Sequence, residues 1–133
     1  MAESSSPTRS RRALIVEDET MIALNLEADM RKLGFDTCDL AANGQQARSQ
    51  AMSHQPDVVL MDVNLEGGRE GIEAAKLLRE ECEAPIVFVT AHTDPDTVER
   101  IHQVVPGAPV LSKPVWVDRL VEAVKAVTTF RMW

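Results

Sequence analysis

Five residues whose side chains could do chemistry together each stand at the end of a short apolar run. Glu17 and Asp18 follow the first run, and Asp62 follows the third. Carboxylates that are brought together repel one another, which raises the pKa of some of them unless a cation is present. A set of oxygen ligands favours Mg²⁺, Mn²⁺ or Ca²⁺ over zinc. The remaining two residues, Thr90 and Lys113, follow the fourth and fifth runs.

These residue types suit phosphoryl transfer. A carboxylate that a metal ion leaves partly free can act as a nucleophile toward phosphorus. A lysine ammonium and a hydroxyl can stabilise the oxygens of the transferring group, because its transition state needs positioned positive charge and hydrogen bonds. Each residue alone has a simpler explanation, since an acid after a strand, such as Glu17 or Asp18 before Thr20, is often only the N-cap of a helix. The five together favour a functional site.

The order of apolar patterns predicts the elements that position these residues. Continuous apolar runs bounded by polar residues predict buried parallel strands, and apolar residues that recur every three or four positions predict helices. The predicted strands cover 13–16, 37–42, 58–61, 85–89 and 109–111. The predicted helices carry Ile22, Leu26, Met30 and Leu33 before Gly34; residues 45–53; Ile72, Ala75, Leu77 and Leu78; Val98, Ile101 and Val105 after a cap at Asp96; and residues 120–127.

Alternating strands and helices predict an α/β fold, a doubly wound (βα)5 parallel sheet with right-handed crossovers. The carboxyl ends of parallel strands meet at one edge of the sheet, where open α/β sheets bind ligands. Because neighbouring strands lie about 4.8 Å apart, the ends of four strands can converge on one cleft. We therefore expect the five polar residues to meet there.

Length and charge limit the classes of protein. The 133 residues fit one domain, which we place at 13–130 after a flexible, basic tail at 1–12. A net charge of −7 argues against a nucleic-acid interface. Cys38 and Cys82 form no CxxC pair, so we expect neither a zinc site nor a redox motif. No apolar run approaches the ~20 residues of a membrane span, and we expect a cytoplasmic protein without membrane contact.

From Ala13 to Val127, the sequence resembles the receiver domains of bacterial two-component response regulators. Any one matching motif is weak, but four in the family's order and spacing are specific. They are Ile15-Val16-Glu17-Asp18-Glu19, Leu60-Met61-Asp62-Val63-Asn64-Leu65, Val89-Thr90-Ala91 and Leu111-Ser112-Lys113-Pro114. The resemblance implies a flavodoxin-like sheet with strand order 2-1-3-4-5, and a phosphorelay protein that switches conformation to control a partner.

The resemblance also implies a role for each acid. Asp62 would accept the phosphoryl group. Asp18 and Asp62 would ligate Mg²⁺ directly, together with the backbone carbonyl of Asn64. Glu17 would act on the metal through a bound water. A Glu-Asp pair after the first strand replaces the two aspartates of many receivers, which is a common variation.

Further residues would act on the phosphoryl group or transmit its arrival. Thr90 would donate a hydrogen bond to it and Lys113 would form an ion pair with it. The peptide bond between Lys113 and Pro114 would be cis. Ala91 is small, which would leave the acceptor open to its donor. We treat residues 66–71 as a flexible strand-to-helix loop, because their glycines lack the Lys-Ser/Thr of a phosphate-binding loop.

Val110 and His92 bear on the switch. Val110 stands three residues before Lys113, where the best-known receivers have Tyr or Phe. A valine cannot sweep out the volume of a ring, so we expect backbone shifts in residues 92–96 and in the fourth helix to carry the output. His92 stands where a side chain could influence water access to the phosphoryl group, or it is an exposed loop residue.

The expected partners are proteins. The phosphoryl donor would be a histidine kinase or a histidine phosphotransfer protein, and the target would contact the face of the fourth helix, fifth strand and fifth helix. A homodimer is compatible with this interpretation. The chain would not be a conventional enzyme, although it would catalyse its own phosphotransfer and slow dephosphorylation.

Three alternatives remain. A docking domain independent of phosphorylation would keep the fold without needing the five polar residues. A phosphohydrolase of the haloacid dehalogenase type would need a second acid at Asn64. A flavodoxin-like electron carrier would need a Ser/Thr/Gly-rich loop where Glu17, Asp18 and Glu19 stand.

Overall fold

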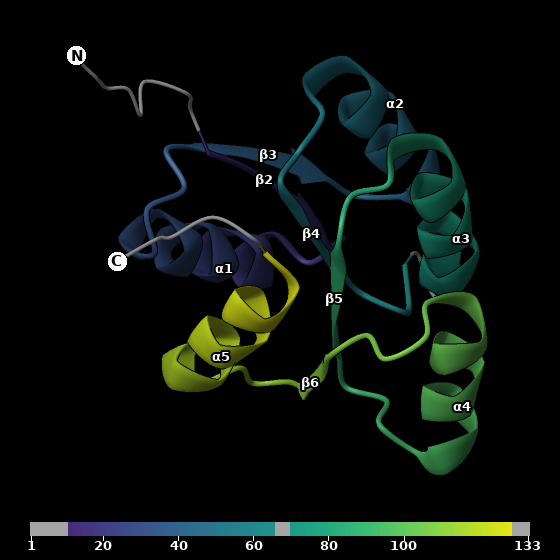
Figure 1. The fold of residues 1–133 in the computed structure, drawn as a ribbon. Coiled ribbons are helices and arrows are strands. Elements are labelled where there is room, and N and C mark those ends of the chain that lie inside the picture. Colours follow the sequence, from purple (N-terminus) through teal and green to yellow (C-terminus); the bar gives the residue numbers. More distant parts are fainter. Residues whose placement is uncertain (1–10, 66–69, 129–133) are drawn as a thin grey trace.

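Five short strands form one parallel sheet at the centre of the molecule (Figure 1). The computed structural model describes residues 11–65 and 70–128. The sheet order is β3-β2-β4-β5-β6, which confirms the predicted strand order 2-1-3-4-5 and the α/β class. The strands are β2 (Arg12–Val16), β3 (Thr37–Ala41), β4 (Val58–Met61), β5 (Ile86–Thr90) and β6 (Val110–Ser112).

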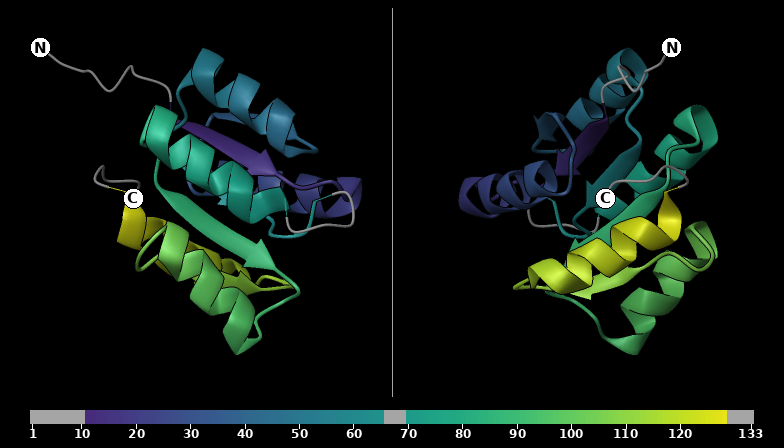
Figure 2. Two further views of the ribbon diagram at one scale, coloured as in Figure 1. Left: turned by 90° about the vertical axis from the view of Figure 1, so that its right-hand side faces the viewer. Right: turned by 60° about the vertical axis from the view of Figure 1, so that its left-hand side comes forward.

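Helices cover both faces of the sheet, as a doubly wound fold requires. Figure 2 shows α2, α3 and α4 in front of the sheet in one view, and α1 and α5 in front in the other. Each face buries its own apolar cluster against the sheet, and every residue of β4 and β5 is buried. The helices are α1 (Thr20–Lys32), α2 (Gly44–His54), α3 (Glu70–Cys82), α4 (Pro95–Val104) and α5 (Val117–Val127).

The start of α4 corrects one prediction. Asp94, and not Asp96, is the N-cap, because its carboxylate accepts hydrogen bonds from the N–H of Thr97 at 3.1 Å and from the Thr97 hydroxyl at 2.9 Å. Pro95 then occupies the first helical turn, where its missing N–H costs nothing. Asp96 lies inside the helix. A proline at the first turn was the signal for the earlier start.

Other boundaries move by a residue or two. The first strand begins at Arg12, which we had counted in the tail. Glu70 and Gly71, which we had counted in a loop, begin α3. The rest of that loop, at 66–69, lies outside the described residues, as do 1–10 of the tail and 129–130 at the predicted domain end. In the part of the chain that the structure describes, no helix is both long and apolar enough to cross a membrane.

Candidate functional site

The hydrogen bonds of the sheet continue past the strand ends and fix the backbone of the polar residues. The N–H of Glu17 donates to the Ala41 carbonyl at 2.9 Å, and the N–H of Asp62 donates to the Val16 carbonyl at 3.0 Å. The N–H of Lys113 donates to the Thr90 carbonyl at 3.0 Å. The parallel register therefore brings these residues to one edge, as the sequence predicts.

Three carboxylates gather at this edge. Glu17, Asp18 and Asp62 each offer an oxygen, and the three oxygens lie within 4.8 Å of one another. Glu17 is 4% exposed and Asp62 is 5% exposed, whereas the side chain of Asp18 is exposed to solvent. The cluster thus has one open side and two buried acids.

Lys113 is the cation that balances the buried acids. Its Nζ lies 2.7 Å from Glu17 Oε1 and 2.9 Å from Asp62 Oδ2. Burial raises the pKa of Glu17, and the ion pair with Lys113 only partly offsets this rise. Burial would lower the pKa of Lys113, but its close contacts with the Glu17 and Asp62 carboxylates outweigh that effect and raise it. Sequence reasoning assigned Lys113 to the phosphoryl group and missed its pairing with Glu17.

The donor set of the cluster fits a hard divalent cation. All three groups are carboxylates, the ligands that Mg²⁺ and Ca²⁺ prefer. The buried Oε1 of Glu17 accepts no well-directed hydrogen bond from the described residues, although it is paired with Lys113, so it retains capacity for a water or an ion. Asp62 Oδ1 accepts a long hydrogen bond, at 3.2 Å, from the N–H of Asn64. The residues present can therefore hold a metal ion.

Thr90 lies beneath the exposed loop between β5 and α4. Its side chain is fully buried, and its Oγ1 accepts a hydrogen bond from the N–H of His92 at 3.0 Å. The side chains of Ala91 and His92 are exposed. Val110 is half-buried and packs against the apolar cluster between the sheet and α2, α3 and α4.

The loop from β6 to α5 carries Lys113 to the carboxylate cluster. The Lys113–Pro114 peptide bond is cis. Val115 is half-buried and packs against the apolar cluster beneath α1 and α5. The loop holding the cation is thereby attached to the core.

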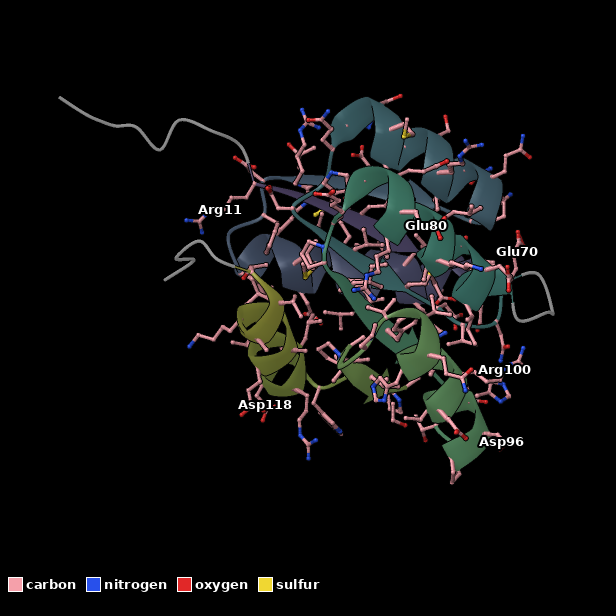
Figure 3. The ribbon with its side chains drawn as sticks, turned by 45° about the vertical axis from the view of Figure 1, so that its right-hand side comes forward. Arg11, Glu70, Glu80, Asp96, Arg100 and Asp118 are labelled. Carbon is pink, nitrogen blue, oxygen red and sulfur yellow. The ribbon has the colours of Figure 1, made fainter. Side chains whose placement is uncertain are left out.

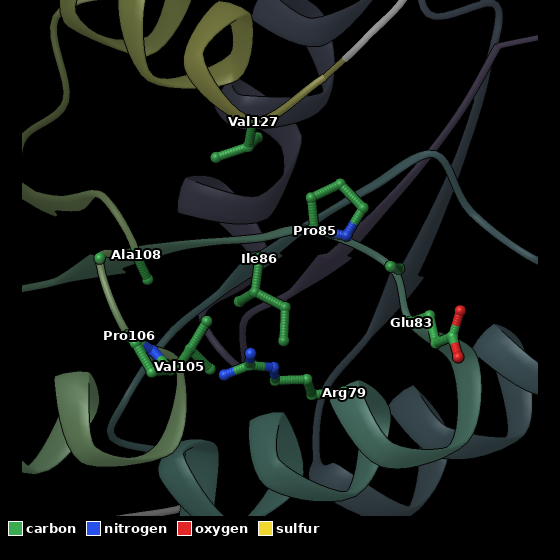
Figure 4. Close-up of a pocket in the computed structure, with 10 residues that line it drawn as sticks. Arg79, Glu83, Pro85, Ile86, Val105, Pro106, Ala108 and Val127 are labelled. Atoms are coloured by element: carbon green, nitrogen blue, oxygen red, sulfur yellow. The ribbon is translucent and has the colours of Figure 1, made fainter.

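A cavity of about 290 Å³ lies at the opposite, amino edge of the sheet (Figure 4). Ile86, Val105 and Ala108 line it, together with Arg79, whose Nη1 donates to the Val104 carbonyl at 2.9 Å. In Figure 4 the guanidinium of Arg79 and the carboxylate of Glu83 point in opposite directions. This cavity therefore lacks the gathered charges of the carboxyl edge.

Known proteins are similar to this chain in both fold and sequence. A family model of the response regulator receiver domain matches residues 13–125. The transcriptional regulatory protein PdtaR of Mycobacterium tuberculosis is 39% identical over 122 residues, which are 91% of this chain and 58% of PdtaR. The DNA-binding response regulator MtrA of the same organism is 36% identical over 120 residues, which are 90% of this chain and 51% of MtrA.

A solved structure agrees. The receiver domain of a modulated diguanylate cyclase from Desulfovibrio desulfuricans G20 is 34% identical, with a TM-score of 0.79, over 90% of this chain and 94% of that one. The chain spans little more than half the length of the curated relatives it matches. Sequence, fold and relatives agree, and the chain belongs to the family of two-component response regulator receiver domains.

Proposed function

We propose that Asp62 is the phospho-acceptor of this receiver. The observation that supports this proposal is the position of the buried Asp62 carboxylate at the carboxyl edge, where it contacts the Lys113 ammonium and lies beside two further acids. In the reaction an Asp62 oxygen forms a new P–O bond while the bond between phosphorus and the donor breaks. The donor leaves with the electron pair of that bond, and Asp62 becomes an aspartyl phosphate.

Mg²⁺ is the proposed metal. Asp18 and Asp62 would hold it through their carboxylates, with the backbone carbonyl of Asn64 as a third ligand and Glu17 acting through a water. When bound, the ion supplies positive charge that offsets the charge of the acids and of the phosphoryl oxygens. The exposure of Asp18 supports entry of the ion from solvent.

Lys113 and Thr90 stabilise the phosphoryl group in this scheme. Lys113 already contacts Asp62 at 2.9 Å and needs little movement to reach an oxygen bound to that residue. The Thr90 hydroxyl donates to the phosphoryl group, and its hydrogen bond from the N–H of His92 links it to the loop that follows. These two groups let the chain catalyse its own phosphorylation and slow dephosphorylation.

The output passes through backbone rather than through a rotating ring. Val110 packs against the core and lacks the volume of an aromatic side chain. We therefore infer that the phosphorylated state shifts residues 92–96 and α4. Amide chemical shifts with and without beryllofluoride test this, and shifts confined to the residues around Asp62 would contradict it.

A partner protein reads the face of α4, β6 and α5. Asp96 and Arg100 project from α4 and Asp118 from α5 (Figure 3). Trp116, before α5, is 72% exposed. The net charge of −7 supports a protein rather than a nucleic acid as the partner of this domain.

The donor side of the scheme is also a protein. A histidine kinase or a histidine phosphotransfer protein is the proposed donor, since none of the three histidines lies in a phosphodonor-helix pattern. Such a donor implies a cytoplasmic location. Self-association into a homodimer is compatible with the scheme.

Incubation with acetyl phosphate and Mg²⁺, followed by intact mass measurement, tests the function. We expect the mass of one phosphoryl group to be added to wild type and to an Asp96→Asn control, whose changed acid lies exposed on α4. Asp62→Asn should gain no mass. Uptake by Asp62→Asn would contradict the assignment, no uptake by wild type would favour a docking domain, and many turnovers would favour a hydrolase.

A further inference from the structure

Gly71 lies in the first turn of α3 and contacts the backbone that carries Asp62. Its N–H donates to the carbonyl of Val63 at 2.9 Å. A Cβ placed on Gly71 would lie 2.8 Å from the carbonyl carbon of Asp62, 2.8 Å from Val63 Cα and closer still to the carbonyl oxygen of Asp62. Cβ atoms in proteins essentially never lie within 3.0 Å of such non-bonded atoms. There is therefore no room for any other residue at this position.

The missing room cannot be made by a side-chain rotation. All three neighbouring atoms belong to the backbone of Asp62 and Val63, so a larger residue must displace the loop or the helix itself. The requirement is for space rather than for a left-handed conformation, since Gly34 and Gly107 have positive φ and Gly71 does not. The backbone that would move holds Asp62 and leads directly to Asn64.

The first turn of α3 is also held from its other side. The Glu70 carboxylate accepts a hydrogen bond from the N–H of Gly44, the first residue of α2, at 3.2 Å. The Asn43 side chain caps the same helix end by accepting from the N–H of Gln46 at 2.8 Å. The start of α3 is thus seated between α2 and the loop that follows β4.

We propose that Gly71, seated by the Glu70–Gly44 hydrogen bond, is the residue that positions the Asp62–Asn64 backbone for metal binding and phosphoryl acceptance. A Mg²⁺ site tolerates little displacement of its ligands, because Mg²⁺ requires near-ideal octahedral geometry. A shift of about 1 Å at reacting groups can slow a reaction roughly 100-fold. The inference rests on the proposed acceptor role of Asp62 and extends it to a residue that does not touch the reacting atoms.

Mn²⁺ affinity is the first test, measured from the electron paramagnetic resonance signal of free Mn²⁺. We expect Gly71→Ala to bind Mn²⁺ about tenfold more weakly than wild type, the size of loss seen when supporting residues of metal sites are changed. Phosphoryl uptake from acetyl phosphate should slow roughly 100-fold. Wild-type Mn²⁺ affinity in folded Gly71→Ala would overturn the proposal.

A matched control separates positioning from general stability. Ala75 is fully buried in the same helix, and Ala75→Gly weakens α3 without adding an atom against the loop. We expect Ala75→Gly to unfold at a lower urea concentration and to keep wild-type Mn²⁺ affinity. If Ala75→Gly loses as much Mn²⁺ affinity as Gly71→Ala, the role of Gly71 is structural only and the proposal fails.

A second pair of variants decides the question if Gly71→Ala does not fold. Glu70 is exposed, so Glu70→Ala removes the contact with Gly44 without a clash, and Glu70→Gln keeps an acceptor while removing the charge. Weaker Mn²⁺ binding in Glu70→Ala than in Glu70→Gln supports the proposal, and equal affinities overturn it. If wild type binds Mn²⁺ but takes up no phosphoryl group, the proposed function fails while the positioning result stands on the Mn²⁺ data.

Discussion

The two edges of the sheet hold similar residue types but very different electrostatics. At the carboxyl edge, the Lys113 ammonium contacts the two buried acids Glu17 and Asp62, and the exposed Asp18 lies beside these acids. At the amino edge, Arg79 and Glu83 line a cavity together with apolar residues, and Arg79 donates a hydrogen bond to the Val104 carbonyl. The cavity at the amino edge shows that a hollow alone does not mark a reactive site.

The register of the strands explains the difference. Hydrogen bonds between β2, β3, β4, β5 and β6 continue to Glu17, Asp62 and Lys113, so the sheet itself holds charged residues in place where they leave the core. At the amino edge the chain enters the strands through Pro85 and Pro109, which donate no hydrogen bond. Both acids that are buried among the described residues, Glu17 and Asp62, therefore lie at the edge where the strands end in polar residues.

The largest difference between the edges should appear when each cation is removed. Lys113→Met leaves Glu17 and Asp62 buried without their partner, and we expect the free energy of unfolding to fall by about 3–5 kcal/mol in EDTA. Arg79→Met removes one hydrogen bond and should cost about 1 kcal/mol. Urea unfolding of both variants measures this, and equal losses would mean that the two edges do not differ electrostatically.

Mg²⁺ should stabilise the protein through the carboxyl edge alone. At a concentration 100-fold above the dissociation constant, binding adds about 2.7 kcal/mol to the free energy of unfolding. We expect this gain to be small in Asp18→Asn and unchanged in Glu83→Gln, whose acid lies at the amino edge. Thermal unfolding with Mg²⁺ or EDTA provides the measurement. A gain that survives in Asp18→Asn would place the ion elsewhere.

Two histidines allow a smaller comparison of the edges. His92 follows Thr90 at the carboxyl edge, whereas His102 Nε2 lies 2.9 Å from the Ala108 carbonyl at the amino edge. If the exposed His92 side chain controls water access, His92→Ala should change the rate of phosphoryl loss severalfold and His102→Ala should not. Decay of the phosphorylated mass over time measures the rate. An unchanged rate in His92→Ala would make His92 an ordinary loop residue.

The smallest effect should come from an exposed ion pair between two helices, α2 and α3. Arg48 Nε lies 2.7 Å from Glu81 Oε1 and joins α2 to α3, and the hydrogen bond from Arg48 lowers the pKa of Glu81 from its ordinary value. A carboxyl group whose pKa is lower in the folded than in the unfolded protein stabilises the fold at pH values above its unfolded-state pKa. This contribution is lost as the pH falls through its folded-state pKa. Arg48→Ala should therefore be slightly less stable than wild type at neutral pH. The difference should vanish well below pH 4.5 and in high salt.

Much of the site was predictable because parallel strands bring their ends together. The run 58–61 is β4, and the acid after it lies where the pattern requires. The pairing of Lys113 with Glu17 was not predictable, because it depends on side-chain reach across the sheet. A buried glutamate needs a partner, which was the available signal.

The predictions that were wrong concern positions where two local sequence signals compete or where tertiary packing decides. Asp94 and Asp96 are both good caps, and the helix starts after the one that precedes Pro95. Gly71 looked like part of a flexible glycine-containing loop, but the path of α3 over Asp62 and Val63 makes a glycine necessary there. The need for a glycine at this position arises from tertiary packing and leaves no periodic pattern in the sequence.

The turn at Gly107 has a practical consequence for anyone who wishes to label this protein. Gly107 lies in the connection from α4 to β6, and a Cβ placed there would meet nothing within 4 Å. Its positive φ of 74° marks it as a tight turn, which a short glycine-rich insertion can replace without strain. Surface turns of this kind accept inserted segments well. A fluorophore carried on such an insertion would sit at the edge away from Asp62 and could report on the proposed shift of α4 without touching the proposed acceptor.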